Sequence, residues 1–152
     1  MKEYEQALDS FRDSIQLDSK YALAYHGLGN IYYQTGKFQT AAENFKRATE
    51  LDPKLADAHT ALGESYFHVR KYREATQAFR EAVTLDPSSA EARYNLAIAC
   101  LNISQRSCAL EQYNLLKAEQ PYLSAKLFQQ IFQSKIVNGG VHQSTAGNHS
   151  SN

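Results

Sequence analysis

The chain has 152 residues, enough for one domain with an apolar core. Apolar residues make up 43% and charged residues 21%, a composition that is typical of a folded protein and excludes a largely disordered one. Lys and Arg together number 16 and Asp and Glu number 16, so the formal net charge is zero. Because nucleic-acid binders usually carry a basic excess, this balance disfavours a nucleic-acid partner.

The sequence shows no membrane span and no export signal. No apolar run approaches the roughly 18 residues of a membrane helix, and the first residues, MKEYEQALDS, lack the apolar core of a secretory signal. Cys100 and Cys108 are too few for a disulfide framework, and their spacing fits no usual metal site. We expect a reducing, cytoplasmic setting by default, with Cys100 as a small buried apolar residue.

The chain repeats itself at a fixed interval. Pro53, Pro87 and Pro121 lie 34 residues apart, and other residues fall into columns at the same spacing: Leu28, Leu62 and Leu96; Gly29, Gly63 and Ala97; Tyr32, Tyr66 and Cys100; Ala7, Ala41, Ala75 and Ala109; Phe11, Phe45, Phe79 and Tyr113. Such repetition indicates a stack of similar units, each of which buries its apolar face against its neighbours.

The pattern predicts a pair of helices in each unit. Residues 1–18 supply only a second helix, so no first helix of the same unit covers its apolar side. Either the chain is a fragment of a longer array, or something else covers that surface. Residues 22–34 form a first helix with apolar residues at i and i+4, and a turn at 35–37 leads to the second helix. The LDP segment ends the unit, because proline disfavours helix in the residue before it.

Another helix is expected after the last unit. Leu127, Phe128, Ile131 and Phe132 form an apolar stripe within about 122–136, which we interpret as a helix that caps the stack. The alternative is an amphipathic arm that docks elsewhere, for instance on a second copy of the chain. Residues 137–152 have two adjacent glycines and almost nothing to bury, and are predicted to be a disordered tail.

The columns resemble the tetratricopeptide repeat, whose pattern is W-x2-L-G-x2-Y, then A-x3-F, then P over 34 residues. The resemblance covers about residues 1–123: a partial repeat at 1–21 and repeats at 22–55, 56–89 and 90–123, within a domain at 1–136. Tyr25 and His59 replace the tryptophan, and the third repeat is decayed at Arg93, Ala97, Cys100 and Leu116. The resemblance implies an all-α, right-handed solenoid of antiparallel helix pairs with a C-terminal capping helix.

On a helical wheel, one side of each first helix lies opposite the core, and in this family that side lines the concave surface where ligands bind. We predict a partner-binding surface there: Leu23, His26, Asn30, Tyr33, Asp57, Thr60, Glu64, Phe67, Glu91, Tyr94, Ile98 and Leu101, with Gln34, His68 and Asn102 on the same side. Its charges are all carboxylates, so it should be an apolar groove with an acidic rim. Tyr33, Phe67 and Leu101 share a column that could equally pack between neighbouring units.

We therefore expect a protein–protein interaction module, an adaptor or scaffold that binds a peptide or helix with apolar anchors and basic residues. One alternative is a structural scaffold that self-associates through its terminal helices. Another is a non-catalytic segment of a larger enzyme. Some members of the family clamp chaperone C-termini with Lys, Asn and Arg, but the clamp columns here hold His26, Asn30, Ala61, Glu91 and Asn95. Only Asn30 matches, and a carboxylate that faced Glu91 would be repelled.

Motifs for catalysis are absent from the sequence. It has no phosphate-binding glycine loop, no G-x-S-x-G and no H-E-x-x-H. Its histidines are scattered and do not suggest a shared metal site. We expect no enzymatic activity, no cofactor and no metal.

Overall fold

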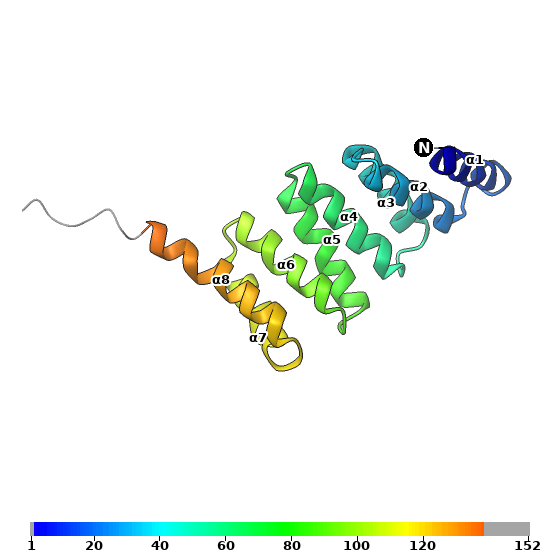
Figure 1. The fold of residues 1–152 in the computed structure, drawn as a ribbon. Coiled ribbons are helices and arrows are strands. Elements are labelled where there is room, and N and C mark those ends of the chain that lie inside the picture. Colours follow the sequence, from blue (N-terminus) through cyan, green and yellow to red (C-terminus); the bar gives the residue numbers. More distant parts are fainter. Residues whose placement is uncertain (1, 139–152) are drawn as a thin grey trace, which may run out of the picture.

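The computed structural model describes residues 2–138 as helices joined by short turns (Figure 1). The helices are α1 (Lys2–Leu17), α2 (Ala22–Gln34), α3 (Phe38–Leu51), α4 (Ala56–His68), α5 (Tyr72–Leu85), α6 (Ala90–Asn102), α7 (Arg106–Glu119) and α8 (Pro121–Asn138). Helix α8 therefore extends two residues into the segment that was expected to be a tail, and residues 139–152 lie outside the described residues.

The helices form a curved stack of two layers. Each helix packs against the next one along the chain, and across units α2 contacts α4, α4 contacts α6, and α6 contacts α8. The second helices, α3, α5 and α7, make no such contacts with one another. Because first helices contact one another across units and second helices do not, the first helices lie on the inside of the curve. The predicted all-α solenoid is confirmed.

The core follows the columns of the repeat. Phe45 and Phe79 are at most 1% exposed. Each ring lies against the glycine of its own unit's first helix: a methyl group on Gly29 or Gly63 would come within 2.6–2.7 Å of the ring. The small residue thus makes room for the ring that joins the two helices of the unit. The glycine and phenylalanine columns thus record one packing contact in each unit.

The boundary between units has a second local cause besides proline. At the end of each unit the aspartate side chain accepts a hydrogen bond from the backbone N–H two residues later, at 2.9 Å for Asp18 and 3.0 Å for Asp52 and Asp86. This short turn competes with the helix. Asp18 makes the turn without a following proline, so the turn itself does not require one.

The two cysteines correct one expectation. Cys100 is fully buried, as expected, but it forms a disulfide with Cys108 of α7, with 6.1 Å between the Cα atoms. It is therefore not simply a small apolar residue. The antiparallel pairing of α6 and α7 brings the end of one helix beside the start of the next, within disulfide reach. Tyr32 and Tyr66 occupy the corresponding column in the earlier units.

Helix α8 closes the C-terminal end of the stack. Leu127 and Ile131 are fully buried in a cluster with residues of α5, α6 and α7. Phe128 is 46% exposed and contacts Tyr113 and Phe132, with ring centroids 5.9 and 4.4 Å apart. The predicted stripe is thus half core and half surface. Within residues 2–138, none of the helices has the length and hydropathy of a membrane span.

Candidate functional site

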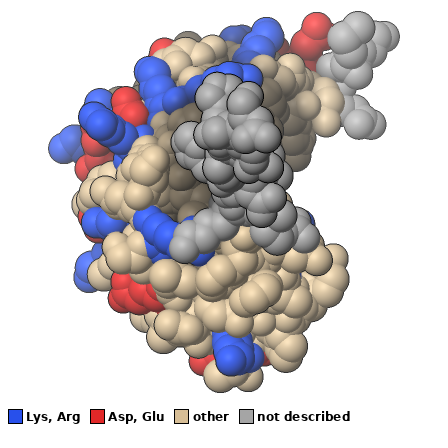
Figure 2. Space-filling view, turned by 90° about the vertical axis from the view of Figure 1, so that its left-hand side faces the viewer, with Lys and Arg blue, Asp and Glu red and all other residues tan. Residues whose placement is uncertain are grey.

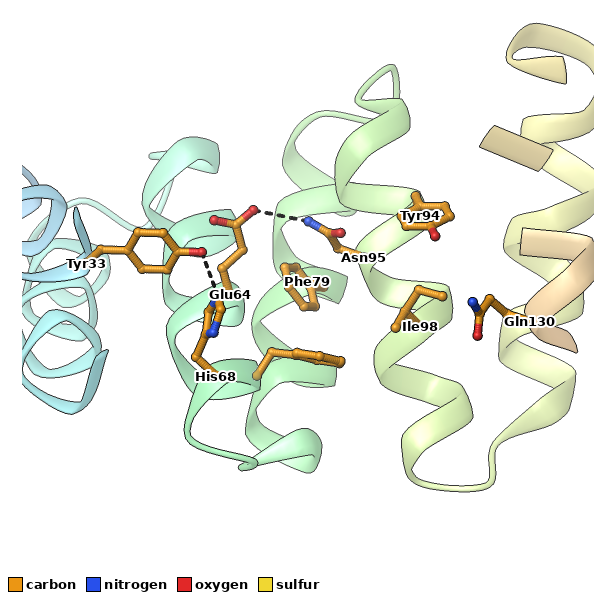
Figure 3. Close-up of a pocket in the computed structure, with 9 residues that line it drawn as sticks. Tyr33, Glu64, His68, Phe79, Tyr94, Asn95, Ile98 and Gln130 are labelled. Atoms are coloured by element: carbon orange, nitrogen blue, oxygen red, sulfur yellow. Dashed lines mark hydrogen bonds between the residues drawn. The ribbon is translucent and has the colours of Figure 1, made fainter. Parts of the chain in front are cut away.

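The first helices bring part of the predicted surface together in a pocket of about 330 Å³. We call it the aromatic pocket; it is lined by Tyr33, Glu64, Phe67, His68, Phe79, Tyr94, Asn95, Ile98 and Gln130 (Figure 3). These side chains come from α2, α4, α6 and α8, with Phe79 of α5 between them. Five of the twelve predicted residues are among them: Tyr33, Glu64, Phe67, Tyr94 and Ile98.

A second pocket, of about 280 Å³, adjoins the first. We call it the acidic pocket; it is lined by His26, Asn30, Asp57, Thr60, Ala61, Glu64, Ser89 and Glu91. Glu64 lines both pockets, which makes them one continuous surface, the concave groove. Leu23 and Leu101 line neither pocket: Leu23 is 50% exposed, and Leu101 packs against the core.

Four lining residues of the aromatic pocket were not among the twelve predicted. Phe79 was assigned to the core alone, although a ring that lies against Gly63 also reaches the inner surface. His68 was predicted on the groove side of its helix but was not among the twelve residues. Asn95 lies next to Tyr94, which was among them. Gln130 belongs to α8, which was interpreted only as a cap. Because Gln130 lines the aromatic pocket, α8 continues the inner layer that the first helices form.

Aromatic contacts hold the wall of the aromatic pocket in place. The ring of His68 stacks on Phe38 with centroids 4.1 Å apart, and the Tyr33 ring meets both edge-on. The Tyr33 hydroxyl lies 3.1 Å from His68 Nε2 (Figure 3). Phe67 packs edge-on against Tyr72 at 5.0 Å. Tyr33 and Phe67 therefore pack between elements and line the pocket at once, whereas Leu101 only packs.

Glu64 is the charged centre of the groove. Its carboxylate accepts a hydrogen bond of 3.2 Å from Asn95 Nδ2. Burial raises the pKa of Glu64, the charge of Glu91 raises it further, and hydrogen bonding with Asn95 and Tyr33 acts in the opposite direction. The pKa of Tyr33 is raised as well, by burial and then by Glu64 and Glu91. Burial is the largest cause of both shifts, and neighbouring carboxylates add to it.

The groove carboxylates have no cationic partner among the described side chains. The ion pairs between described residues join Asp9 with Arg12 and Glu50 with Lys46 and Arg47, all away from the groove. A cation does lie at one edge: Lys126 Nζ of α8 is 5.3 Å from the centroid of the Tyr94 ring. The residues of the predicted face include no Lys or Arg, but α8, which was not counted as part of that face, adds Lys126 at its C-terminal edge.

His26 lies at the other end of the groove. Its ring is 5.5 Å from that of Phe45, and Asn30 Nδ2 lies 3.4 Å from His26 Nδ1. Burial lowers the pKa of His26, and the nearby Asp57 opposes this. His26 is thus a half-buried side chain whose neutral form is favoured by burial. Within the described part of the chain, His, Cys, Asp and Glu form no cluster of three that could hold a metal ion.

Charge elsewhere on the surface is mixed. On the face shown in Figure 2, Lys and Arg are spread among Asp and Glu, and wide uncharged areas lie between them. This distribution agrees with the zero formal net charge of the whole sequence. The groove, which gathers Asp57, Glu64 and Glu91, differs in this respect from the face of mixed charge in Figure 2.

Three solved structures illustrate what the fold is similar to. YrrB, described as a TPR protein with an unusual peptide-binding site, is 24% identical, with a TM-score of 0.82 over 93% of this chain and 72% of that one. MamA is 22% identical, with a TM-score of 0.79 over 90% and 79% of the two chains. The first TPR of Spaghetti (RPAP3), bound to the HSP90 peptide SRMEEVD, is 24% identical, with a TM-score of 0.69 over 78% and 96%. No curated protein matches the chain.

Family profiles identify the repeats directly. A profile described as TPR repeat matches residues 1–36 and 29–68, and one described as tetratricopeptide repeat matches residues 56–89. Together they run over residues 1–89, more than half of the 152-residue chain. The sequence matches, the paired helices and the shared fold show that the chain belongs to the tetratricopeptide repeat family.

Proposed function

We propose that the chain is a non-catalytic protein–protein interaction module that binds a peptide or helix of a partner protein in the concave groove. The observation that carries the proposal is the aromatic pocket, whose apolar side chains remain open to solvent beside carboxylates that form no ion pair with a described residue. A concave surface with apolar walls and a few convergent polar groups is the usual form of a ligand site. Open apolar surface of this kind is also typical of protein-binding sites.

The charge of the groove indicates the chemistry of the partner. The peptide bound by the RPAP3 repeat, SRMEEVD, ends in acidic residues. In this chain Glu91 stands in a clamp column, and Asp57 and Glu64 lie beside it in the acidic pocket. These carboxylates would repel such a peptide and attract Lys or Arg. We therefore expect a partner segment that combines apolar anchors with basic residues.

Removing an anchor contact should weaken binding. Phe67→Ala and Ile98→Ala each delete a side chain of the aromatic pocket, and each should cost about 1–2 kcal/mol of binding free energy, roughly 5- to 30-fold in Kd. Peptides are selected from a displayed random library on the intact chain, and their Kd values are measured by fluorescence anisotropy for each variant. Circular dichroism confirms that the variants remain helical.

The matched control is Leu115→Ala on α7, an apolar residue that is 44% exposed and lies outside both pockets. It should leave the affinity of every selected peptide unchanged. Selected peptides that bind Phe67→Ala and Ile98→Ala as tightly as the intact chain would place the binding surface outside the groove. A selection that yields no peptide, together with self-association in solution, would favour the scaffold alternative.

A further inference from the structure

We propose that the aromatic pocket receives an arginine side chain of the partner, whose guanidinium group lies against the aromatic rings and donates to Glu64. This inference rests on the proposed peptide-binding function and names the side chain that the groove selects. It gives the basic residue of the partner a defined place in the pocket in addition to a general attraction to the acidic rim.

The aromatic walls suit a flat cation with an apolar stem. Tyr33, Tyr94 and the buried ring of Phe79 line the pocket (Figure 3). Phe67 is a further aromatic lining residue. A guanidinium group within about 6 Å of such rings is attracted to their faces. The methylene groups of an arginine can pack against Ile98, because long basic side chains bury their stems while the charged end stays with polar groups.

The polar lining supplies acceptors for several N–H groups. Asn95 donates its amide N–H to Glu64, so its own carbonyl oxygen remains to accept a hydrogen bond. The Gln130 side chain, on the far wall, carries another carbonyl oxygen (Figure 3). Arginine presents five donors in a fixed plane, whereas the lysine ammonium presents three from a single point. A lining with acceptors on two walls therefore favours arginine over lysine.

A purely apolar occupant would leave Glu64 in a poor environment. It would remove water from a half-buried carboxylate that has no cationic partner among the described side chains, and the hydrogen bond from Asn95 offsets only part of that cost. An arginine replaces that water with charge-assisted hydrogen bonds. Asp57 and Glu91, in the adjoining acidic pocket, add to the attraction for a cation.

Lys126 provides an independent test of this arrangement. Its ammonium group lies 5.3 Å from the Tyr94 ring centroid, so this ring already attracts a cation of the chain itself. None of the lining residues of the aromatic pocket is Lys or Arg. A second cation in the pocket would be repelled by Lys126, and removal of that charge should therefore favour an arginine ligand.

The experiment is a titration of the isotopically labelled chain followed by nuclear magnetic resonance. The probes are Nα-acetyl-arginine amide, its neutral isostere Nα-acetyl-citrulline amide, and Nα-acetyl-leucine amide. We expect saturable shifts of the backbone signals around Glu64 and Ile98 with the arginine probe, and at least about tenfold weaker binding of the other two. Glu64→Gln should weaken the arginine probe about tenfold, and Lys126→Met should strengthen it about two- to fivefold. Glu111→Gln, on the exposed side of α7, should change nothing.

Two results would overturn the arginine assignment. One is a leucine or citrulline probe that binds the pocket as well as the arginine probe. The other is an arginine probe that shifts no pocket signal, or binds Lys126→Met more weakly than the intact chain. In either case the proposed groove function stands if the selected peptides still lose affinity with Phe67→Ala and Ile98→Ala. The groove function fails if those variants bind normally, so the two failures are distinguishable.

Discussion

Phe79→Ala is expected to lower the free energy of unfolding by about 3–5 kcal/mol, as truncation of a fully buried aromatic residue does. The ring is 1% exposed and belongs to the cluster that joins α4 and α5 to α6. It also fills the space left by Gly63, so its loss opens a cavity that the two helices of the unit cannot close without moving. Urea unfolding followed by circular dichroism measures the effect.

The control for this prediction is the same change on the surface. Phe128→Ala removes an identical ring that is 46% exposed on α8, and it should cost less than about 1.5 kcal/mol. Equal losses in the two variants would contradict the assignment of Phe79 to the core. Gly63→Ala tests the contact from the other side, since its methyl group would lie 2.7 Å from the Phe79 ring and must displace it.

The fold was predictable because the repeat columns record helix packing. A small residue at Gly29 or Gly63 and an aromatic residue at Phe45 or Phe79 recur together because each pair forms one contact. Together with the other columns at the same interval, they define two helices and their face-to-face arrangement. The fold class is therefore predictable from residues whose main packing contacts lie within their own unit.

The candidate site was only partly predictable, because its C-terminal wall breaks the register of the repeat. Helices α4 and α6 begin three residues after Pro53 and Pro87, whereas α8 begins at Pro121 itself. A position counted from the proline therefore faces a different direction in α8. Lys126 and Gln130 lie at the groove for this reason, and no column of the earlier units indicated them.

The disulfide was missed for a related reason. Counting cysteines treats spacing along the chain, whereas Cys100 and Cys108 meet across the turn of an antiparallel helix pair. An antiparallel helix pair, as predicted for each unit, places these two positions close together. The sequence also signalled Cys100 directly, because it replaces the tyrosine of its column.

Glu64→Gln is expected to change stability and binding in opposite directions. Burial and the charge of Glu91 raise the pKa of Glu64 in the folded chain, so folding favours the protonated form. This contribution to stability is present at acid pH and is lost as the pH rises through the raised pKa. At neutral pH the ionised carboxylate therefore costs stability. Glutamine is neutral, has nearly the same shape, and keeps an oxygen that can accept from Asn95.

The variant should thus be more stable than the intact chain at pH 7, by a margin that shrinks as the pH falls and Glu64 becomes protonated. It should at the same time bind arginine-containing peptides on the order of ten- to a hundredfold more weakly, because it loses the charged acceptor. Thermal unfolding across a pH series and anisotropy titrations with selected peptides measure the two effects. Glu91→Gln, at an exposed position, should show both effects more weakly.

A loss of stability in Glu64→Gln would show that the carboxylate mainly holds α4 against α6 through Asn95, and that it has a structural role. A gain of stability with a loss of binding would have a different meaning. A half-buried carboxylate that opposes folding at neutral pH, and that has no cationic partner among the described side chains, has its charge satisfied only when a partner supplies the cation. Glu64 would then lower the stability of the free chain and contribute favourably to the free energy of binding, a trade-off that is common at binding sites.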